Sequence, residues 1–248
     1  MDLSIIIPVY NNINFTRNAL NDLLQLPSNH EIIIVDNASS DETPMVMNEF
    51  LNKQNPERAK LVYIGCPRNL GFGRANNKGY KHSVGENVLF LNNDIRVQSD
   101  FQSWTKPIIE NCKLDKMISP NGGLLDGNFN FIRETDDLRN DANFYLSGWC
   151  LASSRKVFDS LILNHYSHDQ TDLIMEGRAW GPWNEKFFAY FEDGDLTWRA
   201  KQQGIPIDVL HVPVHHFGKM TSRKLDLSAM YKKSLGIFRE IWAEKLAK

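Results

Sequence analysis

Short apolar runs that each stop at polar residues constrain the fold of this chain more than any other feature. Residues 3–9 are rich in Ile and Val and stop at Tyr10, as buried strands of a parallel sheet commonly do. Residues 31–35 repeat the pattern, and shorter runs of the same kind occupy residues 61–64 and 88–91. We therefore predict four buried strands in the first part of the chain.

Helical patterns fill the gaps between these runs. Apolar residues recur at helical spacing from Phe15 to Leu24, and Pro27 closes the pattern. Pro44 suits a first helical turn and precedes another apolar stripe, and a third helix is expected over residues 74–83. Strands that alternate with helices predict an α/β fold with a doubly wound, mostly parallel sheet.

Composition and charge narrow the class of protein. The 248 residues are 42% hydrophobic and 23% charged, which is typical of a globular chain and not of a disordered or fibrous one. Lys and Arg total 28 against 30 Asp and Glu, so a nucleic-acid partner is not expected. The three Cys residues form no Cys-x-x-Cys pair, and no apolar run is long enough for a signal peptide or a membrane span. We expect a cytoplasmic chain without a transmembrane segment.

The second half of the chain is less regular. Residues 119–147 are rich in Gly, Asn and Asp and are expected to form long loops. A helix is predicted at 196–203, and a strand at 209–214 that Pro213 interrupts. A helical stripe near the C-terminus predicts packing against the domain or a second subunit, with attachment to a membrane surface as the alternative. The stripe consists of Tyr231, Leu235, Phe238, Ile241 and Trp242.

Polar clusters follow three of the predicted strands. In an open parallel sheet, ligands bind in the crevice outside the carboxyl ends of the strands, so the clusters are predicted to converge there. Asp36 is suited to accept from an N–H of a nucleotide base, and Asp94 to hold a divalent cation beside a diphosphate. The alternative is that each is a turn residue, because Asp and Asn are favoured at strand ends. The clusters are Tyr10-Asn11, Asp36-Asn37 and Asn92-Asn93-Asp94.

Five segments, taken in their order along the chain, resemble those of a known family. They are similar to segments of the family 2 glycosyltransferases with the GT-A fold, in the branch that includes rhamnosyltransferases. The resemblance extends from about residue 3 to about residue 220. The segments are Ile5-Ile6-Ile7-Pro8-Val9-Tyr10-Asn11, Ile34-Val35-Asp36-Asn37-Ala38-Ser39-Ser40-Asp41, Asn69-Leu70-Gly71-Phe72-Gly73-Arg74-Ala75-Asn76-Asn77-Lys78-Gly79, Leu91-Asn92-Asn93-Asp94 and Glu192-Asp193-Gly194-Asp195-Leu196-Thr197-Trp198-Arg199.

This resemblance implies that a sugar is transferred, with inversion, from a nucleotide diphosphate sugar to an acceptor hydroxyl, as in glycan or polysaccharide synthesis. It implies a UDP- or dTDP-sugar donor, Mn²⁺ or Mg²⁺ as the cation, and a glycan, a lipid-linked saccharide or a protein as the acceptor. It divides the chain into a nucleotide-sugar-binding half at 1–98, an acceptor-binding and catalytic half at 99–220 and a C-terminal helical segment at 221–248, and it is compatible with a homodimer and with peripheral attachment to a membrane. The positions that it assigns to donor binding are Pro8, Tyr10, Asn11, Asp36, Asn37, Arg68, Asn76, Asn92 and Asn93.

The reaction requires a base, because an acceptor hydroxyl is a poor nucleophile at neutral pH. By the resemblance, Asp193 takes the proton from the acceptor, and Glu192 beside it binds the acceptor. The alternative is that Asp193 or Asp195 only caps the helix that begins near Leu196, where an acidic side chain is favoured in any case.

The metal site implied by the resemblance involves Asp94 and a histidine. Where the family usually has Asp-x-Asp, this chain has Asn-Asn-Asp, which leaves Asp94 as the carboxylate. His215 and His216 follow the last predicted strand, and only one of them should reach the crevice because neighbouring strand residues point to opposite faces. We choose His215 from its position in the motif.

Two other functions compete with glycosyl transfer. A nucleotidyltransferase also uses a doubly wound sheet, carboxylates and a metal, but it would be expected to have a glycine-rich, basic loop after the first strand, and Pro8-Val9-Tyr10-Asn11 has neither property. A nucleotide-sugar-binding module without activity is the second alternative. The adjacent Glu192 and Asp193 argue against it.

Overall fold

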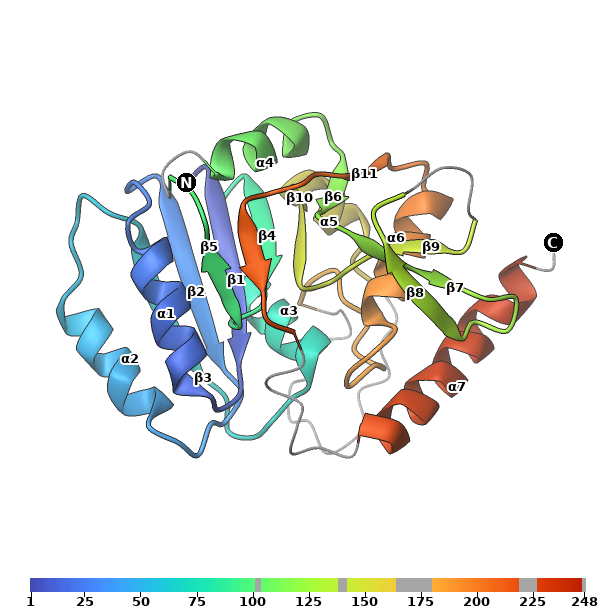
Figure 1. Cartoon of the computed structure of the whole chain (residues 1–248), viewed down its shortest axis with the longest axis horizontal. Coiled ribbons are helices and arrows are strands. Elements are labelled where there is room, and N and C mark those ends of the chain that lie inside the picture. The colour runs from blue at the N-terminus through green and yellow to red at the C-terminus, as the bar shows by residue number, and fades with distance from the viewer. Residues whose placement is uncertain (101–103, 138–141, 164–179, 219–226, 247–248) are drawn as a thin grey trace.

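The four strands predicted from the apolar runs form in the computed structural model, which describes residues 1–100, 104–137, 142–163, 180–218 and 227–246. They pair in parallel in the order β4-β1-β2-β3, with their carboxyl ends at one edge of the sheet (Figure 1). The β-branched residues of the two central strands are fully buried, as the apolar runs require. The strands are β1 (Leu3–Val9), β2 (His30–Asp36), β3 (Lys60–Gly65) and β4 (Asn87–Leu91).

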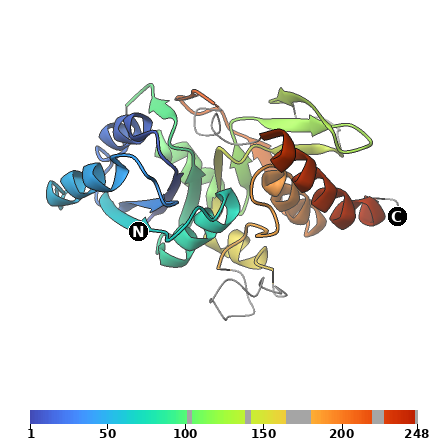
Figure 2. The same ribbon diagram turned by 90° about the horizontal axis from the view of Figure 1, so that it is seen from below.

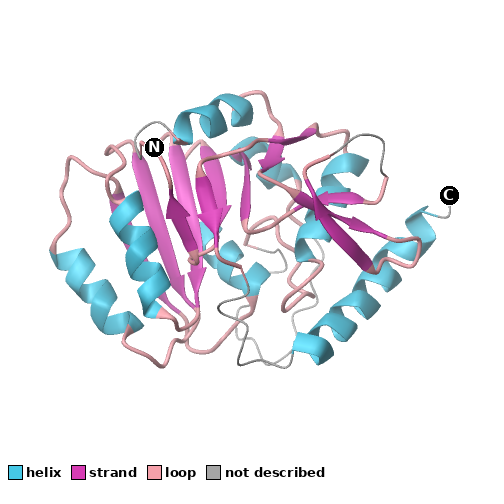
Figure 3. Ribbon diagram, in the orientation of Figure 1, coloured by secondary structure: helices cyan, strands magenta, loops and turns pink. Residues whose placement is uncertain are grey.

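Helices cover both faces of this sheet, as the doubly wound prediction requires (Figures 2 and 3). On one face, Ile5 packs in a cluster with Leu20 of one helix and Ile108 of another. On the other face, Ile6 packs with Tyr80 and Phe158, because neighbouring strand residues point to opposite sides. The first face carries α1 (Ile13–Leu23), α2 (Thr43–Asn52) and α4 (Thr105–Cys112), and the second carries α3 (Phe72–His82), α5 (Arg155–Ser160) and α6 (Glu192–Gln202).

Three strands from the second half of the chain extend the sheet to seven. They are β10 (Cys150–Ser154), β6 (Met117–Ser119) and β11 (Ile207–Val209), which give the order β11-β6-β10-β4-β1-β2-β3. Strand β10 pairs antiparallel with both of its neighbours, whereas β11 pairs parallel with β6. Because β10 runs against the others, its beginning lies at the edge where β1, β2 and β4 end.

The prediction of long loops over residues 119–147 was wrong. This segment contains a small antiparallel sheet of β7 (Gly122–Leu125), β8 (Phe131–Thr135) and β9 (Phe144–Leu146), in the order β8-β7-β9. Four of the five residues of the edge strand β8 are exposed, so the strand shows no apolar alternation along the sequence. β8 is a strand because it pairs with β7, and not because its own sequence has the pattern of a strand.

The single strand predicted at 209–214 is two short strands. β11 ends at Val209, and β12 (Val214–His216) begins after Pro213 and pairs antiparallel with β5 (Ile95–Val97). Pro213 has no N–H for a ladder, but its carbonyl accepts from the Gln98 N–H at 2.7 Å. The break moves the chain from the large sheet to a separate two-stranded one.

The C-terminal helix α7 (Leu227–Leu246) packs on its own domain, as one of the two alternatives predicted (Figure 1). Phe238 and Trp242 are buried against Phe191 and Trp198, in a cluster separate from the two that flank the sheet. Among the described helices, none is both long and apolar enough to cross a membrane.

Candidate active site

A cavity of about 450 Å³ lies where the carboxyl ends of β1 and β4 meet the beginning of α6. Eight of the residues predicted from sequence contribute to its wall, and they come from both halves of the chain. The sequence places them at strand ends or helix starts, where backbone direction changes and polar side chains are free to face a ligand. These residues are Pro8, Tyr10, Asn37, Asn92, Asn93, Asp94, Glu192 and Asp193.

Four residues predicted to bind the donor lie outside this lining. The Asp36 carboxylate is buried and accepts from the Ser39 N–H at 2.8 Å and from the Tyr63 hydroxyl at 2.6 Å. Desolvation and this bond raise the pKa of Tyr63, so the phenol stays a donor. Asp36 therefore holds the loop after β2 in the described structure. The other three are Asn11, whose amide oxygen accepts from the Ser40 N–H, Arg68, which is exposed, and Asn76, which is fully buried in α3.

His216, and not His215, faces the cavity. Its Nε2 lies 3.1 Å from Oδ1 of Asp94, and its ring stacks on Trp149 with centroids 4.5 Å apart and planes 6° apart. Because β12 pairs with β5 as a strand, its successive residues face opposite sides, and His215 lies on the exposed side, against the ring of Phe217. The position of His215 in the motif was an insufficient guide, since the face depends on the register of β12 against β5.

Asp94 and His216, with Asn92 beside them, are arranged so that the carboxylate and the imidazole could hold a divalent cation. Nε2 of His216 also lies 3.2 Å from Nδ2 of Asn92, so three polar side chains converge on one point. A hard cation such as Mg²⁺ or Mn²⁺ is commonly held by one or two protein ligands together with substrate phosphates. Within the described ranges, no group of three or more His, Cys, Asp and Glu side chains could hold a metal by itself. The two-ligand set fits a cation that is shared with a phosphate-bearing substrate.

Glu192 and Asp193 begin helix α6 and face the same cavity. The Asp193 carboxylate accepts from the Gly148 N–H at 3.1 Å and from the Gly194 N–H at 2.9 Å, which fixes its orientation. Burial raises the pKa of Asp193, and the two N–H groups oppose that rise. Burial also raises the pKa of Glu192, and the neighbouring Asp193 charge adds to it. A carboxylate with a raised pKa is a stronger base, which is what proton removal from a hydroxyl needs.

The turn before α6 has a strained backbone. Tyr190 and Phe191 both adopt left-handed conformations, with φ of 70° and 68°, which bulky residues rarely do. Packing offsets the strain, because Phe191 contacts Tyr231 and Phe238 of α7. The Ser234 hydroxyl also donates to the Ala189 carbonyl at 2.7 Å. Helix α7 thus holds the turn that presents Glu192 and Asp193 to the cavity.

Gly71 joins the two sides of the cavity. It has φ of 84°, and a Cβ at this position would collide with the carbonyl oxygen of Phe188. The Phe72 N–H donates to that same carbonyl at 2.8 Å, and the Asn37 amide donates to the Gly71 carbonyl at 3.1 Å. The backbone at Gly71 therefore bonds to both the strand-end side and the turn before α6.

Sequence reasoning missed several residues of the cavity wall. Gly148 and Trp149 precede β10, and Glu134 lies on the unpredicted strand β8. His216 was visible as one of two adjacent histidines. Nothing in the local sequence marks Glu134, because its position depends on pairing between distant strands.

Comparison with known proteins finds relatives for the first part of the chain. Residues 4–113, which run from the second residue of β1 to the end of α4, match the family model described as Glycosyl transferase family 2. The glycosyltransferase GlyA of Streptococcus pneumoniae is 29% identical over 110 residues, which are 44% of this chain and 15% of GlyA. The poly(ribitol-phosphate) beta-N-acetylglucosaminyltransferase TarS of Staphylococcus aureus is 30% identical over 97 residues, 38% of this chain and 16% of TarS. The chain thus aligns with less than a fifth of the length of either relative.

Two solved structures extend the comparison to most of the fold. The crystal structure of residues 1–349 of S. aureus TarS superposes with a TM-score of 0.58 at 20% identity, covering 85% of this chain and 58% of that one. The structure of GalNAc-T7 with UDP, GalNAc and Mn²⁺ gives 0.65 at 14% identity, covering 87% and 44%. Both are GT-A glycosyltransferases, and the likeness confirms the prediction of an α/β fold of this type with a mostly parallel central sheet.

Proposed function

We propose that the cavity binds a nucleotide diphosphate sugar and that the protein transfers the sugar, with inversion, to an acceptor hydroxyl. The observation that carries this proposal is that Asp193 and Asp94, far apart in sequence, line one cavity at the carboxyl edge of the sheet. The family model matched by residues 4–113 and the UDP-GlcNAc complex of TarS support a nucleotide-sugar donor.

Asp193 acts as the base in this proposal. Its carboxylate is oriented by the Gly148 and Gly194 N–H groups, and it takes the proton from the acceptor hydroxyl as the new glycosidic bond forms. The acceptor oxygen attacks the anomeric carbon opposite the leaving group, and the nucleoside diphosphate departs. Pro8, Tyr10 and Asn37 lie on the donor side of the cavity and bind the nucleotide part.

Asp94 and His216 are the residues that would hold a divalent cation, Mn²⁺ or Mg²⁺. When bound, the cation would neutralise the charge that develops on the departing diphosphate. The presence of Mn²⁺ with UDP in the GalNAc-T7 structure supports this choice.

The finer properties belong to the same proposal. The donor is a UDP- or dTDP-sugar, including dTDP-linked deoxyhexoses such as rhamnose, and residues 1–98 bind it. Residues 99–220 bind the acceptor in glycan or polysaccharide synthesis, and the C-terminal segment 221–248 supports them through the contacts of α7 with the 187–191 turn.

A thermal-shift panel of nucleotide sugars, with and without Mn²⁺, tests donor binding. We expect selective stabilisation by one donor, larger with the cation. Turnover is then measured for Asp193→Asn, which should lose about 10²- to 10⁴-fold in kcat while keeping donor-induced stabilisation, because only the base is removed. No stabilisation by any nucleotide sugar would overturn the proposal. Donor binding in the wild type without any turnover would favour the inactive binding module instead.

A further inference from the structure

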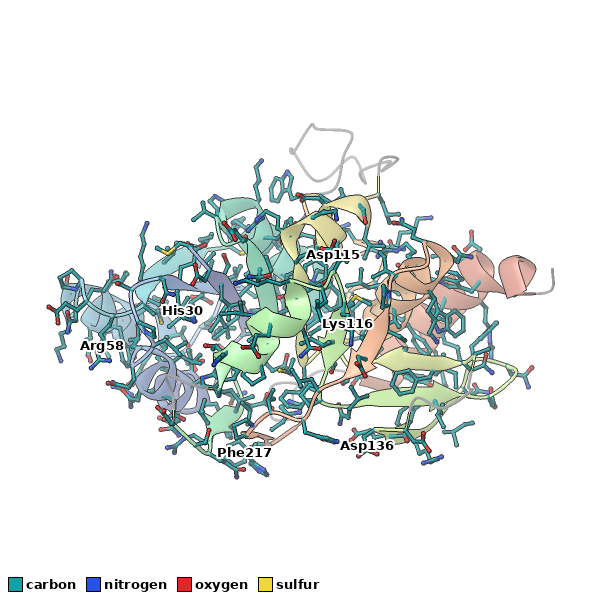
Figure 4. All side chains as sticks on the ribbon, turned by 90° about the horizontal axis from the view of Figure 1, so that it is seen from above. His30, Arg58, Asp115, Lys116, Asp136 and Phe217 are labelled. Atoms are coloured by element: carbon teal, nitrogen blue, oxygen red, sulfur yellow. The ribbon has the colours of Figure 1, made fainter. Side chains whose placement is uncertain are left out.

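The backbone fixes where His216 stands but not the plane of its ring. Strand β12 pairs with β5, and the N–H of Phe217, which is exposed at the edge of the molecule (Figure 4), donates to the Asp94 carbonyl at 2.9 Å. The imidazole can still turn, because the terminal torsion of a histidine side chain has broad preferences. Since only some orientations direct Nε2 to the Asp94 carboxylate, a side-chain contact has to select among them.

Trp149 supplies this contact. Its ring lies almost parallel to the imidazole of His216, with 6° between the planes and 4.5 Å between the centroids. The imidazole can slide within its own plane, but it cannot tilt without losing the stacking contact. The stack therefore keeps the ring in the plane in which Nε2 lies 3.1 Å from Oδ1 of Asp94.

The position of Trp149 is itself fixed from several segments. Its carbonyl accepts from the Asn92 N–H at 2.8 Å, and its Nε1–H donates to Oδ1 of Asn121 at 2.9 Å. The residue also packs against the apolar cluster that contains Ile5 and Leu20. Because both its backbone and its side chain are held, the indole can orient a neighbouring ring and does not simply follow it.

The stack also favours the form of the imidazole that binds a cation. The face of an indole carries the negative part of the ring quadrupole, which attracts positive charge. An imidazole that shares its lone pair with a divalent cation is poorer in electrons than a free one, so it gains more from contact with this face. Loss of the indole should therefore weaken cation binding even where His216 keeps its place.

We propose that Trp149 is a positioning residue that holds the His216 imidazole against Asp94 for the binding of a divalent cation. Asn121 acts through Trp149 by fixing its ring. This inference rests on the proposed function, because it assigns the support of the proposed cation site. The effect of Trp149 is indirect, since the indole nitrogen is a hydrogen-bond donor only and offers no lone pair to a metal.

Electron paramagnetic resonance of Mn²⁺ tests the proposal. MnCl₂ is titrated into protein saturated with the donor that the thermal-shift panel selects, and the free ion is measured. Trp149→Leu should weaken Mn²⁺ binding about tenfold, as the loss of a group that supports a metal ligand commonly does. It should also weaken the magnetic coupling of bound Mn²⁺ to an imidazole nitrogen, which His216→Asn should abolish. Trp149→Phe should retain most of the affinity, because a flat ring still covers the imidazole.

Trp104→Leu is the matched control. Trp104 is 2% exposed and belongs to the same apolar cluster, but it lies outside the cavity lining. Its replacement should lower Tm at least as much as Trp149→Leu, while Mn²⁺ binding and the nitrogen coupling stay unchanged. Asn121→Leu should weaken Mn²⁺ binding in the wild type and add nothing in Trp149→Phe, because a phenyl ring has no N–H to donate to Asn121.

Three results would overturn the inference while donor binding and the loss in Asp193→Asn still stand. The first is unchanged Mn²⁺ binding in Trp149→Leu, and the second is an equal loss in Trp104→Leu, which would point to a general effect of stability. The third is a raised KM for donor or acceptor in Trp149→Leu with unchanged Mn²⁺ binding, because Trp149 would then contact the substrate directly. Absence of donor binding would instead remove the proposed function and the inference with it.

Discussion

The side of the cavity proposed to bind the donor and the side proposed to bind the acceptor are built in different ways. On the proposed donor side, Pro8 is the penultimate residue of β1, Asn37 and Asp94 follow β2 and β4, and the register of the parallel sheet sets where they meet. On the acceptor side, Glu192 and Asp193 follow a turn with two left-handed aromatic residues, held by packing against α7. Backbone pairing places the first group, and side-chain packing between distant segments places the second.

This difference explains how each side responds to change. A strand end is supported by a ladder of hydrogen bonds, so a substitution there acts on ligands and leaves the fold intact. The strained turn is supported by a few aromatic contacts, so a substitution in it acts on stability and function together. The following substitutions test this contrast, beginning with the largest expected effect.

On the donor side, His216→Asn should reduce the apparent affinity for Mn²⁺ in the presence of donor by about 10- to 100-fold, because one of two ligands is lost. His215→Asn should leave it unchanged, since His215 faces away from Asp94. Titration of MnCl₂ against the melting temperature of the donor complex measures both. Equal losses in the two variants would contradict the placement of His216 beside Asp94.

Where the two sides join, Gly71→Ala should destabilise the fold by about 2 kcal/mol, through the left-handed φ and the collision with the Phe188 carbonyl. In a chain of this size that corresponds to about 4–8 °C in Tm. Gly65→Ala is the control, because a Cβ at Gly65 meets no atom within 4 Å. Calorimetry of both proteins would refute the argument if the two substitutions had the same effect.

On the acceptor side, Glu192→Gln should raise Tm by about 2–4 °C near pH 8. The folded pKa of Glu192 lies above its unfolded value, so wild-type stability falls as pH rises through the interval between them, and the neutral amide avoids that loss. The gain should vanish near pH 4, where the carboxyl is protonated in both states. Melting curves at several pH values measure it, and a gain that does not vary with pH would point to packing and not to charge.

The side of the cavity formed by the ends of β1, β2 and β4 could be predicted from sequence, because the sequence patterns that identify these strands are local. The run that ends at Tyr10 and the run that precedes Asp94 identify buried parallel strands, and topology then predicts that their ends converge. The role of Asp36 was harder to foresee, because Tyr63 and Ser39 of neighbouring segments occupy its oxygens.

The side of the cavity formed by the start of α6, β8 and β12 could be predicted only in part. The motif at Glu192 and Asp193 was visible in the sequence. The helix, however, begins at Glu192 and not near Leu196 as predicted. The Asp193 carboxylate also accepts from the N–H of Gly148, which lies 45 positions earlier in the chain. Strand β8 and its Glu134 gave no local signal, and the choice between His215 and His216 depended on how β12 pairs with β5. These features depend on contacts between distant segments, which no short window of residues contains.

The reversed direction of β10 has a consequence for how such a protein can change over time. β10 begins at the cavity. The strands that come just before it in the chain, β7, β8 and β9, therefore lie beside the cavity but form a sheet of their own and do not pair with the large sheet. Insertions, deletions or exchanges in that stretch leave the seven-stranded register untouched. Under the proposed function, one scaffold can therefore acquire new acceptor preferences through changes in this small sheet, while the residues at the ends of β1, β2 and β4 stay the same.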